Sequence, residues 1–167
     1  MGDILIGLWE NKVLIAALAG WTAAQVLKTI LVLMIEKELR LERLMGSGGM
    51  PSSHSAAVCA ACFSCGILYG FDSALFAISA VLAIVVMRDA AGIRREAGKQ
   101  AEVINQISGE LNKKNKKMNF EETLKVLLGH TPLQVIVGAI IGVLMAFLCQ
   151  KVLFPAILPA HTLLGLR

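Results

Sequence analysis

Two short polar segments of the sequence combine residues that bind phosphate with a histidine that can transfer protons. The first is Gly48-Gly49-Met50-Pro51-Ser52-Ser53-His54-Ser55, directly before an alanine-rich apolar run. A proline followed by two serines is typical of a helix start, and free N–H groups and the helix dipole bind anions there. The segment therefore predicts a phosphate site in which Gly49, Ser52 and Ser53 bind the anion. His54, in the first turn, would donate a proton to a leaving oxygen.

The second segment, Gly129-His130-Thr131-Pro132, opens the last apolar run in a similar way. Thr131 is the expected N-cap and Pro132 the expected first helical residue. Two histidines at two helix starts fit a nucleophile and a proton donor around one phosphate. The competing interpretation is that the serines are ordinary caps and that His54 and His130 are structural residues at a membrane interface.

A basic stripe is expected after the third apolar run. Arg88, Gly92, Arg95 and Lys99 are spaced so that one continuous helix would present them on a single face. Arginine matches phosphate oxygens in a bidentate way, so Arg88 and Arg95 are candidate phosphate ligands. The alternative is that they only anchor the helix at the interface.

Two further ionisable residues are candidates because of their positions. Asp89 lies beside the basic stripe, where it would orient a histidine or form a salt bridge with a neighbouring arginine. Lys28 lies inside the first apolar run, and ionisable groups within spans usually face a functional interior. Gln25, one turn earlier, supports a polar face there, and we expect Lys28 to reach the phosphate site by snorkelling.

The elements that must position these residues are membrane helices. Hydrophobic residues make up 56% of the 167 residues and fall into long runs. A helix needs about 20 apolar residues to cross a bilayer. We expect an all-α, polytopic membrane helical bundle with four spans, the third short enough to need tilting or continuation beyond residue 88. The expected spans cover residues 13–35, 55–71, 73–87 and 132–153, and residues 4–9 are too short to cross.

The polar segments give the orientation and the domain organisation. The connections between the first and second spans and between the third and fourth hold 12 of the 16 Lys and Arg residues. The positive-inside rule makes that side cytoplasmic. We expect one integral membrane domain over residues 1–167, with a helical extension up to residue 107 and a flexible basic loop over residues 108–119.

The cysteines predict packing and not a cofactor. Cys59, Cys62 and Cys65 are spaced as in some iron–sulfur ligand sets, but their small apolar neighbours favour close helix packing. With Cys149 alone elsewhere, no disulfide is implied. We expect no metal, no cofactor and no nucleic acid partner.

The sequence resembles the type 2 phosphatidic acid phosphatase superfamily, in particular a divergent branch of small bacterial and plant membrane proteins. This branch is related to acid phosphatases and vanadium haloperoxidases. The resemblance rests on Lys28, on Pro51-Ser52-Ser53-His54-Ser55, on Gly129-His130-Thr131-Pro132 and on the segment from Val86 to Arg95.

The resemblance implies metal-independent hydrolysis of a phosphate or diphosphate ester through a phosphohistidine. His130 would match the attacking histidine and His54 the general acid. Lys28, Ser52, Ser53 and an arginine would match the phosphate ligands.

The sequence departs from the wider family around the nucleophile. Where the family has an arginine six residues before it and an aspartate four residues after it, this chain has Leu124 and Gln134. We expect Arg88 or Arg95 to replace the arginine and Asp89 to replace the aspartate.

Three functions remain open at this point. The first is a lipid-phosphate phosphatase whose substrate is a lipid phosphate in the bilayer. The second is a non-catalytic protein for lipid-phosphate binding, transport or assembly, favoured by the missing aspartate and arginine. A small structural membrane protein is the third. A homo-oligomer is also possible, because Gly138, Ala139 and Gly142 could pack between helices or between subunits.

Overall fold

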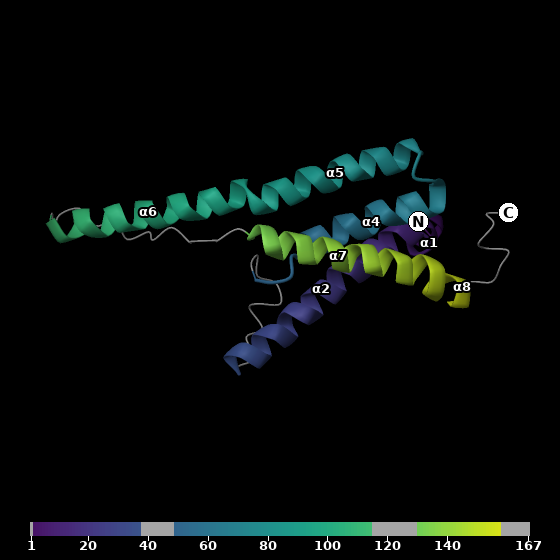
Figure 1. Cartoon of the computed structure of the whole chain (residues 1–167), viewed down its shortest axis with the longest axis horizontal. Coiled ribbons are helices and arrows are strands. Elements are labelled where there is room, and N and C mark those ends of the chain that lie inside the picture. The colour runs from purple at the N-terminus through teal and green to yellow at the C-terminus, as the bar shows by residue number, and fades with distance from the viewer. Residues whose placement is uncertain (1, 38–48, 115–129, 158–167) are drawn as a thin grey trace.

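The computed structural model describes residues 2–37, 49–114 and 130–157, and all regular structure in these ranges is helical. The all-α prediction is confirmed. Figure 1 shows α2, α4 and α7 packed together, with α5 beside them and α6 extending away. The helices are α1 (Gly2–Trp9), α2 (Lys12–Glu36), α4 (Ser53–Tyr69), α5 (Ala74–Ala91), α6 (Ile93–Lys114), α7 (Pro132–Leu148), a π-helical segment η1 (Cys149–Leu153) and α8 (Phe154–Ile157).

Three of the four expected spans are long and apolar enough to cross a membrane. They are Lys12–Ile35, Pro132–Leu153 and Ala74–Glu110, which joins α5 to α6. The expected continuation of the third span beyond residue 88 is therefore confirmed.

The second expected span is a shorter apolar helix. α4 has 17 residues, and at 1.5 Å per residue it is about 25 Å long, short of the roughly 30 Å hydrocarbon core. Its ends are fixed by the N-cap Ser52 and by Gly70, which has a φ of 94°.

α4 is the central helix of the bundle, in contact with α2, α5 and α7. The contacts are close because glycines face it. A Cβ at Gly138 of α7 would meet the carbonyl oxygen of Ser52, and one at Gly142 would meet that of Ala56. A Cβ at Gly20 of α2 would meet the same carbonyl oxygen of Ala56. Small residues thus bring three backbones together, as is common between membrane helices.

The chain after α5 differs in part from the expectation. The helix is interrupted at Gly92, whose φ and ψ are −108° and −83°, and α6 then runs to Lys114. The prediction of a loop was therefore wrong for residues 108–114. Glutamate, leucine and lysine there are good helix formers, and a single glycine costs only about 1 kcal/mol. Residues 115–119 lie outside the described ranges.

The four cysteines are free thiols and are buried. Cys59 contributes to the contact between α4 and α5, since its Sγ lies 3.8 Å from Sδ of Met87. This placement agrees with the expectation of helix packing.

Candidate functional site

The two histidines predicted to act together lie next to each other. The ring centroids of His54 and His130 are 6.2 Å apart, with planes inclined at 57°. One ring comes from the first turn of α4 and the other from the residue before the N-cap of α7. Residues 76 positions apart in the sequence therefore share one site.

Backbone hydrogen bonds hold the two helix starts in place. The N–H of Ser52 donates to the carbonyl of Gln134 at 3.0 Å, which joins the start of α4 to the first turn of α7. The N–H of His130 donates to the carbonyl of Ala90 at 3.0 Å, which joins the start of α7 to the end of α5. Three helices thus fix the position of His130.

The serines before and within α4 are buried at the helix start. Ser52 is the N-cap, and its Oγ accepts from the N–H of Ser55 at 3.3 Å and from the Ser55 hydroxyl at 3.0 Å. Ser53 is 4% exposed and begins the helix, whereas His54 is exposed. Because first-turn N–H groups have no partner within a helix, this end of α4 can accept an anion. The hydroxyl of Ser52 is occupied by capping, and its contact with phosphate remains a prediction.

The hydrogen bonds of Gln134 define the tautomer of His130. Oε1 of Gln134 accepts from the backbone N–H of Thr131 at 3.0 Å, so the oxygen of the amide faces this end of the helix. The same oxygen lies 3.3 Å from Nδ1 of His130. An amide oxygen only accepts, so Nδ1 carries the hydrogen. In the neutral ring Nε2 therefore keeps its lone pair, as a nucleophile requires.

Lys28 is buried beside the start of α4. Its side chain is 2% exposed, and a Cβ at Gly49 would lie 3.6 Å from its Cδ, so the lysine stem passes against Gly49. Gly49 has a φ of 82°, a conformation that favours glycine. Gln25, one turn earlier on α2, is also buried. In the described ranges no carboxylate forms an ion pair with Lys28, so its charge is available for an anion.

For the acidic and basic candidates of α5 and α6, the structure gives their exposure and one ion pair. Asp89 is half-buried and precedes Ala90, whose carbonyl binds His130. Arg88 is exposed on the same turn of α5. Lys99 pairs with Glu96 at 2.7 Å on the surface of α6.

The interruption at Gly92 means that the predicted stripe does not lie on one continuous helix. Arg95 is in α6, but its side chain is outside the described part of the structure. Gly48 and Leu124 lie outside the described residues altogether.

Gln134 is the residue that sequence reasoning missed. In the sequence it is only a departure from the family pattern, yet it occupies the expected orienting position on His130. The signal was its spacing, since residues four apart lie on one helix face. Asp89 remains a candidate for a second orienting contact.

Within residues 2–37, 49–114 and 130–157, no three His, Cys, Asp or Glu side chains are grouped so that they could hold an ion.

Comparisons with known proteins cover nearly the whole of this arrangement. The model of the Divergent PAP2 family matches residues 9–145, which include Lys28, both histidines and Gln134. The chain is 40% identical over 147 residues to a Bacillus subtilis (strain 168) protein named "Uncharacterized membrane protein YuiD", covering 83% of this chain and 93% of that protein. No solved structure matches the chain. On the strength of the family match and of this relative, the chain belongs to the divergent PAP2 family of membrane proteins.

Proposed function

We propose that this protein is a membrane lipid-phosphate phosphatase that hydrolyses its substrate without a metal, through a phosphohistidine. The observation that carries the proposal is the pairing of His54 and His130, whose ring centroids lie 6.2 Å apart at the starts of α4 and α7. Membership of a PAP2-related family supports the same reaction class.

The phosphate is bound where positive charge is concentrated. The ammonium of Lys28 has no carboxylate as an ion-pair partner among the described residues, and a lone charge within a span is costly. A phosphate group offsets that cost. The N–H groups of Gly49 and Ser53 and the positive end of the α4 dipole complete the cradle. Arg88, Arg95 and the hydroxyl of Ser52 are further proposed ligands.

The chemistry follows from the two rings. Nε2 of His130 attacks phosphorus, and the bond from phosphorus to the ester oxygen breaks. His54, in its protonated form, donates a proton to the leaving oxygen, which departs as an alcohol. Water then attacks the phosphohistidine while His54 accepts its proton, the nitrogen–phosphorus bond breaks and inorganic phosphate leaves. Gln134, and on our proposal Asp89, hold the nucleophile in orientation.

The surroundings of the site favour an amphiphilic substrate. The site adjoins apolar helices that are exposed along much of their length, including Ile84 of α5 and Ile136 of α7. We further propose that α4 crosses the bilayer as a fourth span, protected by its neighbours, and that the site opens on the cytoplasmic side. A homo-oligomer also remains a proposal.

The test is phosphate release by purified protein from a panel of phosphatidic acid, phosphatidylglycerophosphate and prenyl phosphates and diphosphates. At least one lipid should be hydrolysed, and vanadate should inhibit because it mimics the pentacoordinate transition state. His130→Ala and His54→Ala should reduce release by at least about 100-fold. Unchanged release in both variants would contradict the proposal.

A non-catalytic lipid-phosphate binding, transport or assembly protein is the second candidate. It is favoured by one observation, the amide of Gln134 in place of the family's carboxylate beside His130. An amide orients an imidazole but stabilises a positively charged ring less than a carboxylate does. Tight lipid binding without turnover across the whole panel would favour this function.

A further inference from the structure

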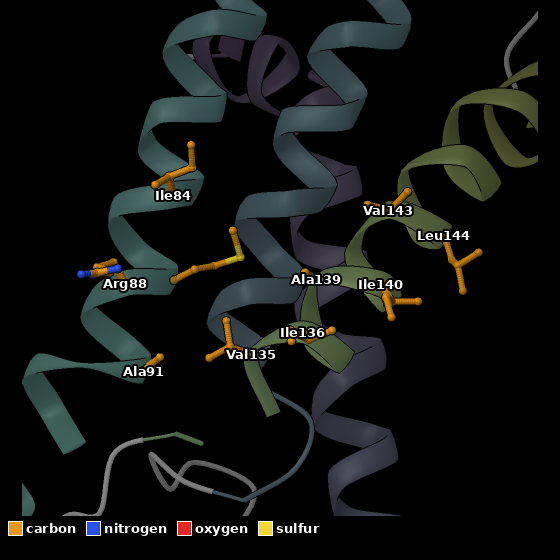
Figure 2. Close-up of a pocket in the computed structure, with 10 residues that line it drawn as sticks. Ile84, Arg88, Ala91, Val135, Ile136, Ala139, Ile140, Val143 and Leu144 are labelled. Carbon is orange, nitrogen blue, oxygen red and sulfur yellow. The ribbon is translucent and has the colours of Figure 1, made fainter. Parts of the chain in front are cut away.

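An apolar groove lies between α5 and α7 and has a volume of about 620 Å³. Figure 2 shows side chains of both helices lining it. Arg88 is the one charged residue among them. The lining residues are Ile84, Met87, Arg88, Ala91, Val135, Ile136, Ala139, Ile140, Val143 and Leu144.

The groove forms because α5 and α7 both pack on α4 and touch each other little. Met87 closes its inner side, with Sδ 3.8 Å from Sγ of Cys59 on α4. Along its outer edge the side chains are more than half exposed, with values of 62% for Ile84, 53% for Ile140 and 62% for Leu144. Since α5 and α7 belong to spans, the groove opens sideways toward lipid.

One end of the groove adjoins the histidine site. Ala91 lines the groove, and its neighbour Ala90 accepts the backbone hydrogen bond of His130. Val135 lines the same end and follows Gln134, which orients His130. Arg88 lines the groove with its aliphatic stem, and Figure 2 shows its nitrogen atoms directed away from the groove, so the groove is apolar along its length.

We propose that this groove holds a hydrocarbon chain of the substrate while the phosphate of the same molecule lies at His130. The inference deepens the proposed function and rests on it. The volume falls within the range of roughly 300–1,000 Å³ typical of small-molecule sites. The adjoining phosphate site selects an anionic headgroup over a neutral lipid, and the open side of the groove lets the chain enter directly from the bilayer.

Photocrosslinking tests occupancy without requiring turnover. Full-length protein in phosphatidylcholine nanodiscs is irradiated with phosphatidic acid that carries a diazirine near the end of one chain, and adducts are mapped by mass spectrometry. Adducts should form on Ile140, Val143 and Leu144. Excess unlabelled phosphatidic acid should compete them away, whereas phosphatidylcholine with identical chains should not.

Three outcomes would overturn the inference. The first is as many adducts on Val85, which is exposed on α5 outside the groove, as on the groove residues. The second is equal competition by unlabelled phosphatidic acid and phosphatidylcholine. The third is that crosslinks to a second copy of the chain replace the adducts in the groove.

A selectivity measurement separates this inference from the proposed function. Val143→Phe fills the groove, and Val85→Phe makes the same change on the open face of α5. We expect Val143→Phe to lower the ratio of kcat/KM for long-chain over dibutyryl phosphatidic acid by roughly tenfold or more. Val85→Phe should leave the ratio unchanged.

An unchanged ratio in Val143→Phe would contradict the groove while leaving the phosphatase intact. If the wild type hydrolyses no lipid of the panel, the phosphatase proposal fails, and the crosslinking result still decides whether the groove binds a chain.

Discussion

At the residue scale, the amide of Gln134 determines which nitrogen of a neutral His130 would react in the proposed mechanism. Its Oε1 accepts from the N–H of Thr131 and from Nδ1, which leaves Nε2 as the basic nitrogen. The sequence predicts both histidines, because histidines at helix starts are conspicuous. It does not predict this contact, since a glutamine four residues after a histidine has no distinctive pattern until the capping box fixes its side chain.

Removing the orienting contact should lower turnover. In Gln134→Leu we expect kcat to fall by about 10- to 100-fold, because the ring loses the bond that fixes its tautomer. Gln134→Glu, which retains an acceptor, should keep most of the activity. The measurement is steady-state hydrolysis of the preferred lipid from the panel.

A second variant controls for the helix cap. Thr131→Ala removes the threonine half of the capping box and leaves the contact between Gln134 and His130, so it should cost about 1 kcal/mol of stability with little change in kcat. If Gln134→Leu were as active as wild type, the tautomer argument would be wrong.

Lys28 should be more important for binding than for stability. In Lys28→Met we expect the affinity for vanadate to fall by about tenfold or more, since a buried charge opposite the anion is lost. The unfolding temperature should equal or exceed that of the wild type, because an ammonium inside a span is costly. Isothermal titration and thermal unfolding in detergent measure the two effects.

Lys99→Met is the matched control for this variant, because Lys99 is exposed and paired with Glu96 on α6. It should change neither quantity. A destabilised Lys28→Met protein with normal vanadate affinity would assign Lys28 a structural role.

At the element scale, the site depends on how closely α7 approaches α4. Gly138 lies against the carbonyl of Ser52, the N-cap of α4, whose N–H donates to the carbonyl of Gln134. The sequence shows Gly138 and Gly142 as small residues suited to helix contacts. It cannot show which helix they face, because GxxxG-type spacing serves contacts within a chain and between chains equally.

Adding one methyl group at this contact should disturb the fold and the site together. Gly138→Ala should destabilise the protein by about 1–3 kcal/mol, since backbone cannot move aside easily. Activity should fall as well, because Ser52 must shift. Gly109→Ala on α6, where a Cβ meets nothing within 4 Å, should instead stabilise by up to about 1 kcal/mol. Equal stabilities of the two variants would contradict the described packing.

Hydropathy predicts the helices well, because apolar length is the main requirement for crossing a bilayer. It fails at details decided by packing or by local helix propensity. α4 is short because its ends are set by Ser52 and Gly70, and α6 extends through a segment that looked like a loop because lysine and glutamate support helix without an apolar face. The predicted basic stripe fails for a similar reason. The sequence spacing places its residues on one face only if the helix is continuous, and Gly92 interrupts it.

At the scale of the whole molecule, the candidate site residues gather at one end of the bundle. The starts of α4 and α7 and the end of α5 meet there, and α6 continues beyond them, whereas the turn between α4 and α5 lies at the other end (Figure 1). The distribution of basic residues predicts that the histidine end is cytoplasmic.

Two cysteine variants test this orientation. Gln106→Cys on α6 and Asp72→Cys in the turn between α4 and α5 place exposed thiols at the two ends. In intact cells an impermeant maleimide should label Asp72→Cys only, and Gln106→Cys should react after lysis. The four native cysteines are buried and provide the background. The reverse labelling pattern would move the site to the outer face.

The central claim is that His130 carries the phosphoryl group during turnover. The most direct measurement is to mix the purified protein with a ³²P-labelled lipid phosphate, quench within milliseconds in alkali, and map the label by mass spectrometry. The account predicts a base-stable, acid-labile phosphoryl group on His130 of the wild type. The group should accumulate in His54→Ala if proton transfer limits the second step. It should be absent in His130→Ala. Phosphate release by the wild type with no label on His130, or with label on another residue, would contradict it.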